Sequence, residues 1–191
     1  MTTGSHITDE QLMEAIQQRG DEGAFNALYQ RYSHRILYFM YKMLKQDEAK
    51  AQDFLQDVFI KIVEHPEKFD SSKRFKTWIF TVAANLCKNY FRSQQRSIVV
   101  LETIDVADEA VEAINWGEQQ PLLLEQLNQA LDDLPYVYKE AFILKHKEGL
   151  SLKEIAQVMA CPLGTVKSRL NSATKKLAKK LNPYKTSIQN Q

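Results

Sequence analysis

The chain has 191 residues, of which 44% are apolar and 26% charged, so it is apolar enough to fold and long enough for one ordinary core or two small ones. It has neither a long apolar run nor a basic N-terminal segment followed by an apolar stretch, which argues against a transmembrane helix or signal peptide and predicts a cytoplasmic protein. Its 2 cysteines stand far apart and its 4 histidines are scattered, which argues against disulfides, metal sites and other cofactors.

The net charge of +1 conceals three segments of different sign. Residues 1–96 hold 14 basic and 12 acidic side chains. Residues 97–138 hold 9 acidic side chains and no basic one, and residues 139–191 hold 11 basic and 3 acidic side chains. Blocks of one sign mark interaction surfaces or solvated linkers more often than catalytic sites. Because metal-ligand spacing, triad spacing and a glycine-rich phosphate loop are all missing, the sequence predicts neither an enzyme nor a small-molecule substrate.

Helical periodicity dominates the first half of the chain, and no alternating strand pattern is found. Thr8 and Gln11 form a capping box that starts a short helix, and Gly20 is placed to end it. A long helix follows, with apolar residues three or four positions apart. Its predicted buried stripe is Leu28, Tyr29, Tyr32, Ile36, Phe39, Met40 and Met43.

A third helix is predicted from Asp47, which can cap it, to Glu64, where His65 and Pro66 end it. Its side away from the core is polar and acidic, with one apolar residue. The residues on this face are Asp53, Gln56, Asp57 and Ile60. A solvated surface is the ordinary interpretation of such a face, and a partner-binding surface is the alternative.

A fourth helix is predicted over about 76–92, inside a segment, 73–96, that mixes cations with aromatic rings and contains no acid. Single-stranded DNA suits such a mixture, because bases stack on rings while cations follow the backbone. The residues that helical spacing assigns mostly to the core are Trp78, Ile79, Val82 and Leu86. The residues expected on the exposed face are Lys76, Phe80, Asn85, Lys88, Asn89 and Arg92.

Periodicity weakens after this helix, and the segment up to Gly117 and Pro121 is acidic. The predicted organisation is therefore all-α, with a helical domain at 1–95, an acidic linker at 96–120 and a smaller helical domain at 121–191. The linker is interpreted either as a self-repelling tether or as an acidic segment that occupies a positively charged channel in place of nucleic acid.

The second domain contains a helix-turn-helix pattern. A helix within LPYVYKEAFILKHKEGL is stopped by Gly149, and a capping box of Ser151 and Glu154 starts a short amphipathic helix. Pro162 then suits the first turn of the next helix, because its missing N–H has no partner there. Two short helices joined by about three residues are typical of a helix-turn-helix.

The last helix has two faces. Val166, Leu170, Ala173 and Leu177 recur at spacings of four, three and four, which predicts that they face the core. The other side is small and polar, then basic, as suits a helix in the major groove of duplex DNA. Its candidate DNA contacts are Thr165, Lys167, Ser168, Asn171, Ser172 and Lys175. Arg169, Lys176, Lys179 and Lys180 lie to the side or later in the helix, where they are expected to contact phosphates without carrying sequence information. The competing interpretation is a solvated lysine-rich helix end that its dipole favours.

The string EGLSLKEIAQVMACPLGTVKSRL closely resembles the promoter-reading helix-turn-helix of bacterial extracytoplasmic-function (ECF) sigma factors. FNALYQRYSHRILYFMYKML, AQDFLQDVFIKIVEH and FKTWIFTVAANLCKNYFR resemble, in order and spacing, the core-binding and promoter-melting helices of that family. The resemblance covers about residues 10–180. The chain departs from the usual family residues at Ala160, Asn89, Ser172 and Thr174, so its base preference does not follow from the resemblance.

The resemblance implies a sigma subunit that binds RNA polymerase core, reads the minus-35 element of duplex promoter DNA with residues 121–191 and opens the minus-10 element with residues 1–95. The acidic face of the third helix would pack on the coiled-coil clamp of the polymerase, where carboxylates meet arginines. An unpaired minus-10 base would need a pocket, for which Asn85 and a nearby loop are candidates. An anti-sigma factor, membrane-bound or soluble, is a further implied partner.

A stand-alone helix-turn-helix repressor or activator is the alternative function. Such a protein binds its operator by itself, usually as a dimer on two half-sites one helical turn apart. Run-off transcription that appears only when the chain is added to core polymerase distinguishes the two functions.

Overall fold

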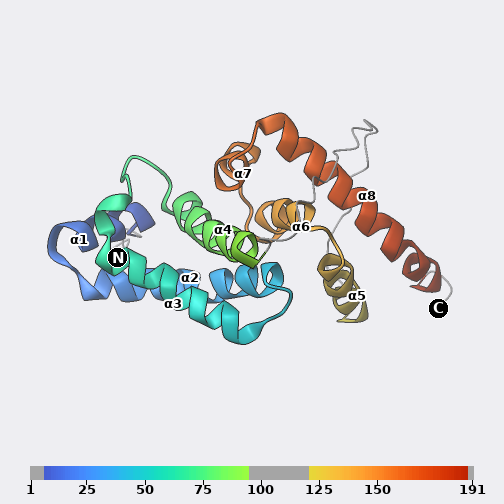
Figure 1. Ribbon diagram of the computed structural model, residues 1–191, viewed down its shortest axis with the longest axis horizontal. Helices are drawn as coiled ribbons and strands as arrows, with labels where there is room; N and C mark the ends of the chain where they lie inside the picture. The colour runs from blue at the N-terminus through green and yellow to red at the C-terminus, as the bar shows by residue number, and fades with distance from the viewer. Residues whose placement is uncertain (1–6, 95–120, 189–191) are drawn as a thin grey trace, which may run out of the picture. The chain divides into compact units, whose positions relative to one another are not determined.

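A computed structural model of the chain describes residues 7–94 and 121–188 (Figure 1). Every regular element in these residues is helical, so the predicted all-α fold is confirmed. The chain divides into two compact units, residues 1–98 and 99–191, which we call the N-terminal and C-terminal units. The predicted linker, 96–120, lies outside the described residues. No helix in the described ranges is both long and apolar enough to cross a membrane.

The first helix, α1 (Asp9–Arg19), begins and ends at the predicted signals. The Gln11 N–H donates to Thr8 Oγ1 at 3.2 Å, and the Thr8 N–H donates to Gln11 Oε1 at 2.9 Å. This reciprocal pair satisfies backbone N–H groups that have no partner within the helix. Gly20 ends the helix with φ at 63°, in the left-handed region that glycine adopts without steric cost.

Two further helices, α2 (Glu22–Met43) and α3 (Glu48–Glu64), pack against each other. Aspartates cap both: Asp21 Oδ1 accepts from the Ala24 N–H and Asp47 Oδ1 from the Lys50 N–H, each at 2.9 Å. The predicted buried stripe of α2 is correct except at Tyr29, which is 43% exposed. The single turn η1 (Pro66–Lys68) and a loop then lead to α4 (Phe75–Gln94).

Aromatic rings from α2 and α4 build much of the N-terminal core. The centroids of Phe39 and Phe80 lie 5.6 Å apart, and those of Tyr32 and Phe75 5.3 Å apart, both edge to face. Phe39, Phe75 and Phe80 are fully buried. Burying a phenylalanine contributes about 1.5 to 3 kcal/mol, and edge-to-face pairs add about 0.5 to 1.5 kcal/mol, so these rings fix how α4 sits on α2.

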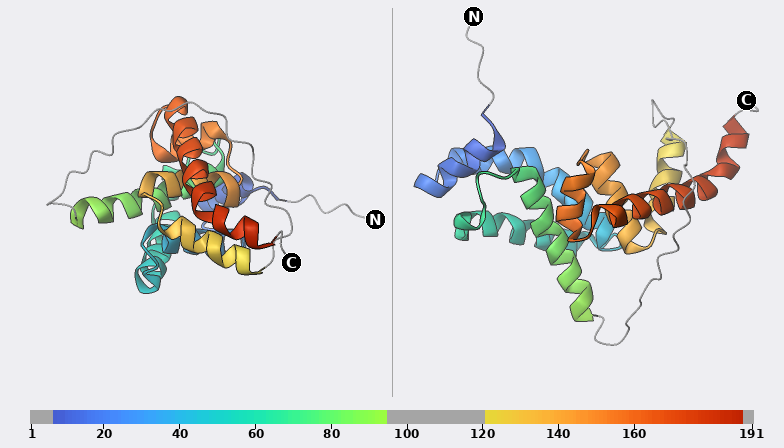
Figure 2. Two further views of the ribbon diagram at one scale, coloured as in Figure 1. Left: turned by 90° about the vertical axis from the view of Figure 1, so that its right-hand side faces the viewer. Right: turned by 90° about the horizontal axis from the view of Figure 1, so that it is seen from above.

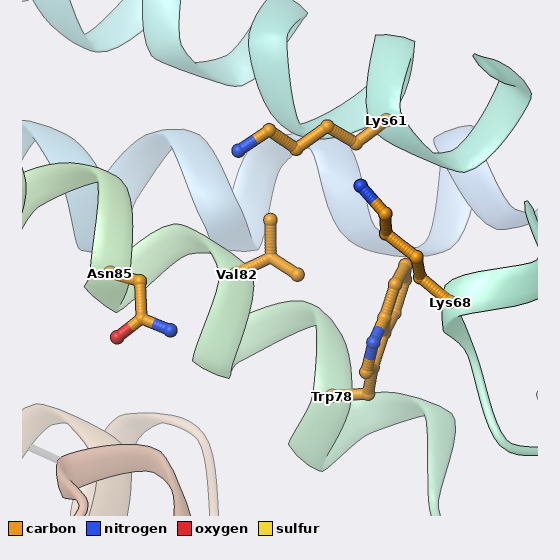
Figure 3. Close-up of a pocket in the computed structure, with 5 residues that line it drawn as sticks. All are labelled: Lys61, Lys68, Trp78, Val82 and Asn85. Atoms are coloured by element: carbon orange, nitrogen blue, oxygen red, sulfur yellow. The ribbon is translucent and has the colours of Figure 1, made fainter. Parts of the chain in front are cut away.

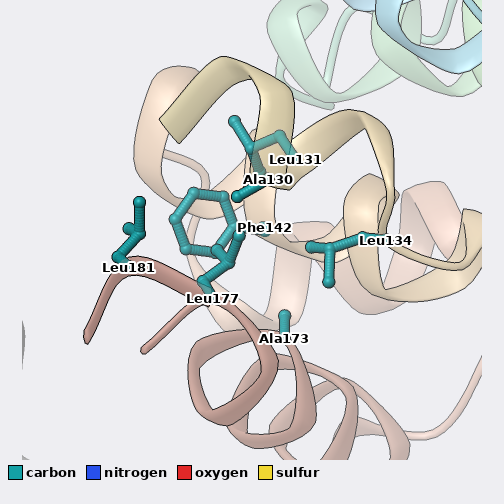
Figure 4. Packing of buried hydrophobic residues seen from close by; sticks show 7 residues of the cluster. All are labelled: Ala130, Leu131, Leu134, Phe142, Ala173, Leu177 and Leu181. Carbon is teal, nitrogen blue, oxygen red and sulfur yellow. The ribbon is translucent and has the colours of Figure 1, made fainter. Parts of the chain in front are cut away.

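The C-terminal unit contains α5 (Pro121–Asp132), α6 (Tyr136–Phe142), the π-helical turn η2 (Ile143–Lys147), α7 (Leu152–Met159) and the long α8 (Leu163–Ile188). An apolar cluster joins α5, α6 and α8 (Figure 4). Its members are Ala130, Leu131, Leu134, Phe142, Ala173, Leu177 and Leu181. α7 packs near the start of α8, while α5 lies beside its later turns (Figure 2).

The helix predicted within LPYVYKEAFILKHKEGL is not uniform. It changes from α-helical to π-helical at Ile143, although it ends before Gly149 as predicted, with φ of that glycine at 67°. The wider turn accompanies a run of six consecutive buried residues, 139–144, which ends in Phe142, Ile143 and Leu144. A regular helical pattern buries such a run less readily, so spacing alone did not indicate this irregularity.

Candidate nucleic-acid and polymerase interfaces

The predicted helix-turn-helix consists of α7 and α8. The Glu154 N–H donates to Ser151 Oγ at 3.3 Å and the Ser151 N–H donates to Glu154 Oε2 at 2.8 Å, which confirms the capping box. The turn depends on Ala160, whose φ of 51° is left-handed although the residue is not glycine. Pro162 directly precedes α8 instead of occupying its first turn, and its carbonyl accepts the Val166 N–H at 3.2 Å.

The faces of α8 agree with the predicted arrangement. Val166, Ala173 and Leu177 are fully buried, whereas Leu170 is only partly buried. Of the predicted DNA contacts, three lysines are exposed: Lys167, Lys176 and Lys179. The partly exposed predicted contacts are Thr165, Ser168, Arg169, Asn171, Ser172 and Lys175. Ser168, Asn171 and Lys175 therefore lie on an accessible face opposite the packed one, while Arg169 and Lys176 lie beside the packed stripe. An accessible polar face of this kind is the geometry that a groove-binding helix requires.

Several side chains of this face already have intramolecular contacts. Ser168 Oγ donates to the Thr165 carbonyl at 3.0 Å, and Arg169 Nη1 donates to Cys161 Sγ at 3.6 Å. Lys176 Nζ lies 5.7 Å from the centre of the Tyr138 ring. Lys180, a further phosphate candidate by sequence, pairs with Asp133 at 2.5 Å. This pair lowers the pKa of the Asp133 carboxyl, first through the hydrogen bond and then through the charge of Lys180.

One predicted contact on α4 is wrong. Phe80 is fully buried between the Phe39 ring and the Arg35 guanidinium, whose carbon lies 5.9 Å from the Phe80 centroid, so it cannot stack on DNA without unfolding. The correction follows from packing on several sides: α4 contacts α1, α2 and α3. The other predicted residues are accessible, Asn85, Asn89 and Arg92 fully and Lys76 and Lys88 in part.

A pocket lies where α3, η1 and α4 meet (Figure 3). Its lining residues are Lys61, Lys68, Trp78, Val82 and Asn85. Its volume of about 190 Å³ is below the roughly 300 to 1,000 Å³ of pockets that enclose a drug-sized ligand. The pocket therefore suits a group no larger than about one base, with an indole for stacking, an amide for hydrogen bonds and two ammonium groups for phosphate.

Sequence reasoning found only Asn85 among these pocket residues. Trp78 and Val82 were assigned to the core, and both are half-buried in the pocket wall. Lys61 and Lys68 come from α3 and η1, outside the basic segment that drew attention to α4. The available signal was the position of Lys68 in the short connection between two packed helices, since such connections run over the surface.

The acidic face of α3 points away from the core, as predicted. Asp53, Gln56 and Asp57 are exposed, and Ile60 is 47% exposed. Lys50 Nζ lies 3.4 Å from Asp53 Oδ2, an exposed pair that contributes little to stability. Val63, one turn beyond Ile60 and 57% exposed, extends the apolar part of this face and was not identified from the sequence.

Both halves of the chain match known sequence families. Residues 28–97 match Sigma-70 region 2, and residues 124–177 match Sigma-70, region 4. The RNA polymerase sigma-H factor of Pseudomonas aeruginosa is 35% identical over 184 residues, which cover 92% of this chain and 94% of that protein. The ECF RNA polymerase sigma-E factor of Escherichia coli K12 is 32% identical over 191 residues, covering 93% and 96% respectively.

Solved structures share the fold. The sigma factor RpoE from Bartonella quintana, in complex with the anti-sigma factor NepR, is 24% identical, covers 83% of this chain and 96% of its own, and gives a TM-score of 0.64. CnrH, in complex with the cytosolic domain of CnrY, is 21% identical, covers 92% and 97%, and gives 0.66. The identities of the curated relatives over nearly the whole chain decide the family. Together with two matched sigma regions, they place this chain among the ECF sigma factors, which direct RNA polymerase to promoters in transcription initiation.

Proposed function

We propose that the two units divide the work of promoter recognition, in the cytoplasm and without catalysis by the chain itself. Residues 1–95 bind polymerase core and open the minus-10 element, residues 121–191 read the minus-35 element, and residues 96–120 join them. The observation that carries this proposal is α8, which follows the α7 turn and exposes a polar, basic face opposite Val166, Ala173 and Leu177. An accessible basic helix behind such a turn is suited to a DNA groove.

Run-off transcription tests the function as a whole. The full chain, purified core polymerase and a library of fragmented genomic DNA are combined, and the transcript starts are sequenced. A sigma factor produces starts that are absent from reactions lacking the chain, upstream of which two sequence elements align. If the chain binds DNA tightly by itself and gives no chain-dependent transcripts, the stand-alone regulator is correct.

Within α8, we assign different roles to different side chains. The side chains proposed to meet base edges are Thr165, Lys167, Ser168, Asn171, Ser172 and Lys175. Those proposed to meet phosphates are Arg169, Lys176 and Lys179. An asparagine can pair with adenine through two hydrogen bonds, which carries sequence information. A lysine ammonium on a phosphate carries none, although it adds affinity that depends on salt.

On the N-terminal unit, we assign the pocket of Figure 3 to an unpaired minus-10 base. The base would stack beside Trp78 while the Asn85 amide reads its edge, and Lys68 would hold a neighbouring phosphate. Lys76, Lys88 and Arg92 are proposed to follow the rest of the strand, since cations along a groove bind the backbone of single strands, and the Asn89 amide is proposed to add a hydrogen bond. Asn85→Ala is expected to relax promoter preference at one minus-10 position. Gln94→Ala, an exposed residue of the same helix with no assigned contact, is the control.

The acidic face of α3 is proposed to bind the polymerase clamp. Carboxylates at Asp53 and Asp57 would meet clamp arginines through charge-assisted hydrogen bonds, while Gln56 and Ile60 complete the contact. Asp57→Arg is expected to weaken core binding at least tenfold without loss of helical content. Glu14→Arg makes the same charge change on the exposed side of α1 and serves as its control. If the two variants bind core with equal affinity, α3 is not part of the polymerase interface.

An anti-sigma factor, membrane-bound or soluble, is proposed to hold the chain inactive. Support comes from the solved fold neighbours, of which one carries the anti-sigma factor NepR and another the cytosolic domain of CnrY. The test is native mass spectrometry of the chain purified from its own host. A bound protein that added core polymerase releases supports the proposal, and an unbound chain opposes it.

A further inference from the structure

α1 contacts η1 and α4, two of the elements that line the pocket, although it lies outside residues 28–97 that match sigma region 2. We propose that α1 positions the pocket loop, residues 66–75, through the side chains of Gln17 and Glu10, and thereby sets which unpaired base the pocket accepts. Both are positioning residues, because neither lines the pocket itself. The inference rests on the base-reading function proposed above for the pocket.

Gln17 holds the loop on both sides of Lys68. Its half-buried amide Nε2 donates to the Pro66 carbonyl at 2.8 Å and to the Phe69 carbonyl at 2.7 Å. These two carbonyls bracket η1, the turn that presents Lys68 to the pocket. An NH₂ group has two protons, and both are used here. Gln17 therefore fixes the backbone of the turn at two points with one rigid, planar group.

Glu10 holds the other end of the loop. Its Oε1 accepts the Phe75 N–H at 3.0 Å, and Phe75 is the first residue of α4. The first turn of α4 contains no acidic side chain of its own, so this carboxylate from α1 is the negative group that meets the positive end of the helix. Sequence reasoning could not find this cap, because its donor lies 65 residues away from its acceptor.

α1 is itself firmly placed, so it can serve as a fixed support. Leu12, Met13 and Ile16 are buried against the unit. Asp9 accepts from Arg31 Nη1 at 2.6 Å and from the Tyr32 hydroxyl of α2. Between the contacts of Gln17 and Glu10, the loop has an internal hydrogen bond, in which Ser72 Oγ donates to the Asp70 carboxylate at 2.7 Å. The contacts of Gln17 and Glu10 therefore hold the backbone on both sides of Lys68 in place.

The decisive variant is Gln17→Glu, which replaces a donor by a carboxylate facing two carbonyl oxygens. Gln18→Glu is the matched control: it is the same change one residue later, on an exposed side chain that donates only within α1, to Glu14 at 3.0 Å. If Gln17→Glu does not fold, Gln17→Met keeps the length and removes both donors. Hydrogen exchange of the free, full-length chain is expected to speed up at least tenfold at amides 68–75 in the Gln17 variant and to stay unchanged in the control.

A second measurement separates positioning from mere stability. Transcription by holoenzyme is measured on promoters randomised across the minus-10 element. A less stable protein lowers transcription from every promoter alike, whereas a displaced loop changes preference at the one position that Asn85→Ala also changes. We expect Gln17→Glu to reduce that preference at least fivefold and to leave preferences in the minus-35 element intact.

The outcomes are distinct for the two proposals. If Asn85→Ala changes base preference and Gln17→Glu does not, the positioning role of α1 is wrong while the pocket keeps its function. If Asn85→Ala changes nothing, the base-reading function of the pocket is wrong, whatever the exchange data show. If exchange at 68–75 is the same in Gln17→Glu and Gln18→Glu, Gln17 does not hold the loop.

Discussion

α4 and α8 are both basic helices assigned to DNA, yet they are packed differently. Each contacts three other helices of its unit. The fully buried residues of α8, Val166, Ala173 and Leu177, lie on one narrow stripe, and Ser168, Asn171 and Lys175 lie opposite it. The buried residues of α4, which include Phe75, Ile79 and Phe80, spread over a much wider part of its circumference. A helix with one narrow buried stripe separates its polar and apolar residues, so its binding face can be identified from spacing, whereas a helix with a wide buried face cannot be interpreted in this way.

The consequence for α4 is an exchange of roles between neighbouring positions. Phe80, expected to stack on DNA, belongs to the core, while Trp78 and Val82, expected in the core, line the pocket. All three are apolar and lie within five residues of one another, so their residue types do not indicate which one is buried and which ones line the pocket. The four predictions below test this contrast, from the largest expected effect to the smallest.

Phe80→Ala is expected to destabilise the N-terminal unit by about 3 to 5 kcal/mol, because it empties a site between Phe39 and Arg35. Asn85→Ala, on the exposed side of the same helix, is expected to change stability by less than about 0.5 kcal/mol. Urea unfolding followed by circular dichroism measures both. Equal stability of Phe80→Ala and wild type would contradict the corrected orientation of α4.

Asn171→Ala and Lys179→Ala divide the exposed face of α8 by role. A bidentate pair with a base discriminates by about 1 to 3 kcal/mol, so Asn171→Ala should relax preference at one minus-35 base pair. Lys179→Ala should weaken binding on every sequence and reduce the salt slope by about 0.9. Holoenzyme titrations on minus-35 variants at several salt concentrations separate the two. If both variants lose the same affinity on every minus-35 sequence, the face binds DNA only through charge and does not read bases.

Ala160→Gly is expected to stabilise the C-terminal unit by about 1 kcal/mol, because a left-handed alanine is strained by roughly 1 to 2 kcal/mol and glycine recovers most of it. Ala156→Gly, inside α7, is the control with the opposite sign, since glycine in a helix costs about 1 kcal/mol. Differential scanning calorimetry checks both. A lower Tm for Ala160→Gly would mean that the turn tolerates alanine without strain.

His146 gives the smallest effect, confined to the C-terminal unit. Its ring packs on Phe142 with centroids 4.4 Å apart, and its pKa is lowered below 6.5, first by burial and then by Lys145. The folded state therefore binds this proton less tightly than the unfolded state. The resulting stability is present above pH 6.5 and is lost as pH falls below it. His146→Gln should flatten this dependence in thermal unfolding measured between about pH 5 and pH 8.

The sequence predicted most helix boundaries, because their signals are local. Thr8, Asp47 and Ser151 act within three residues of themselves, and Gly20 and Gly149 mark helix ends by their own backbone angles. The exposed acidic face of α3 followed from the same kind of reasoning. The roles assigned to these exposed residues stay predictions, since exposure permits a contact but does not identify the partner.

The residues that escaped prediction depend on contacts distant in sequence. Lys61 and Lys68 reach the pocket from elements before α4, and Gln17 reaches the loop from α1. Tyr29 fits the stripe of α2 by spacing, yet it lies at the edge of the core, where its ring packs on Phe59 with centroids 4.7 Å apart. A hydrogen bond between residues 49 or more positions apart, such as that of Gln17 with Pro66, produces no periodic pattern in the sequence of either segment.

The contact between Glu10 and Phe75 also sets an order of events during synthesis. The N-terminal unit receives the cap of α4 from a residue made 65 positions earlier, so α1 leaves the ribosome long before its partner. At about 5 to 20 residues per second, α1 waits roughly 3 to 13 s for Phe75 to appear. During that interval α1 can already pack on α2, which follows it directly, while its contacts with η1 and α4 are still missing. The cap of α4 therefore forms on a helix that has been in place for seconds before α4 is made.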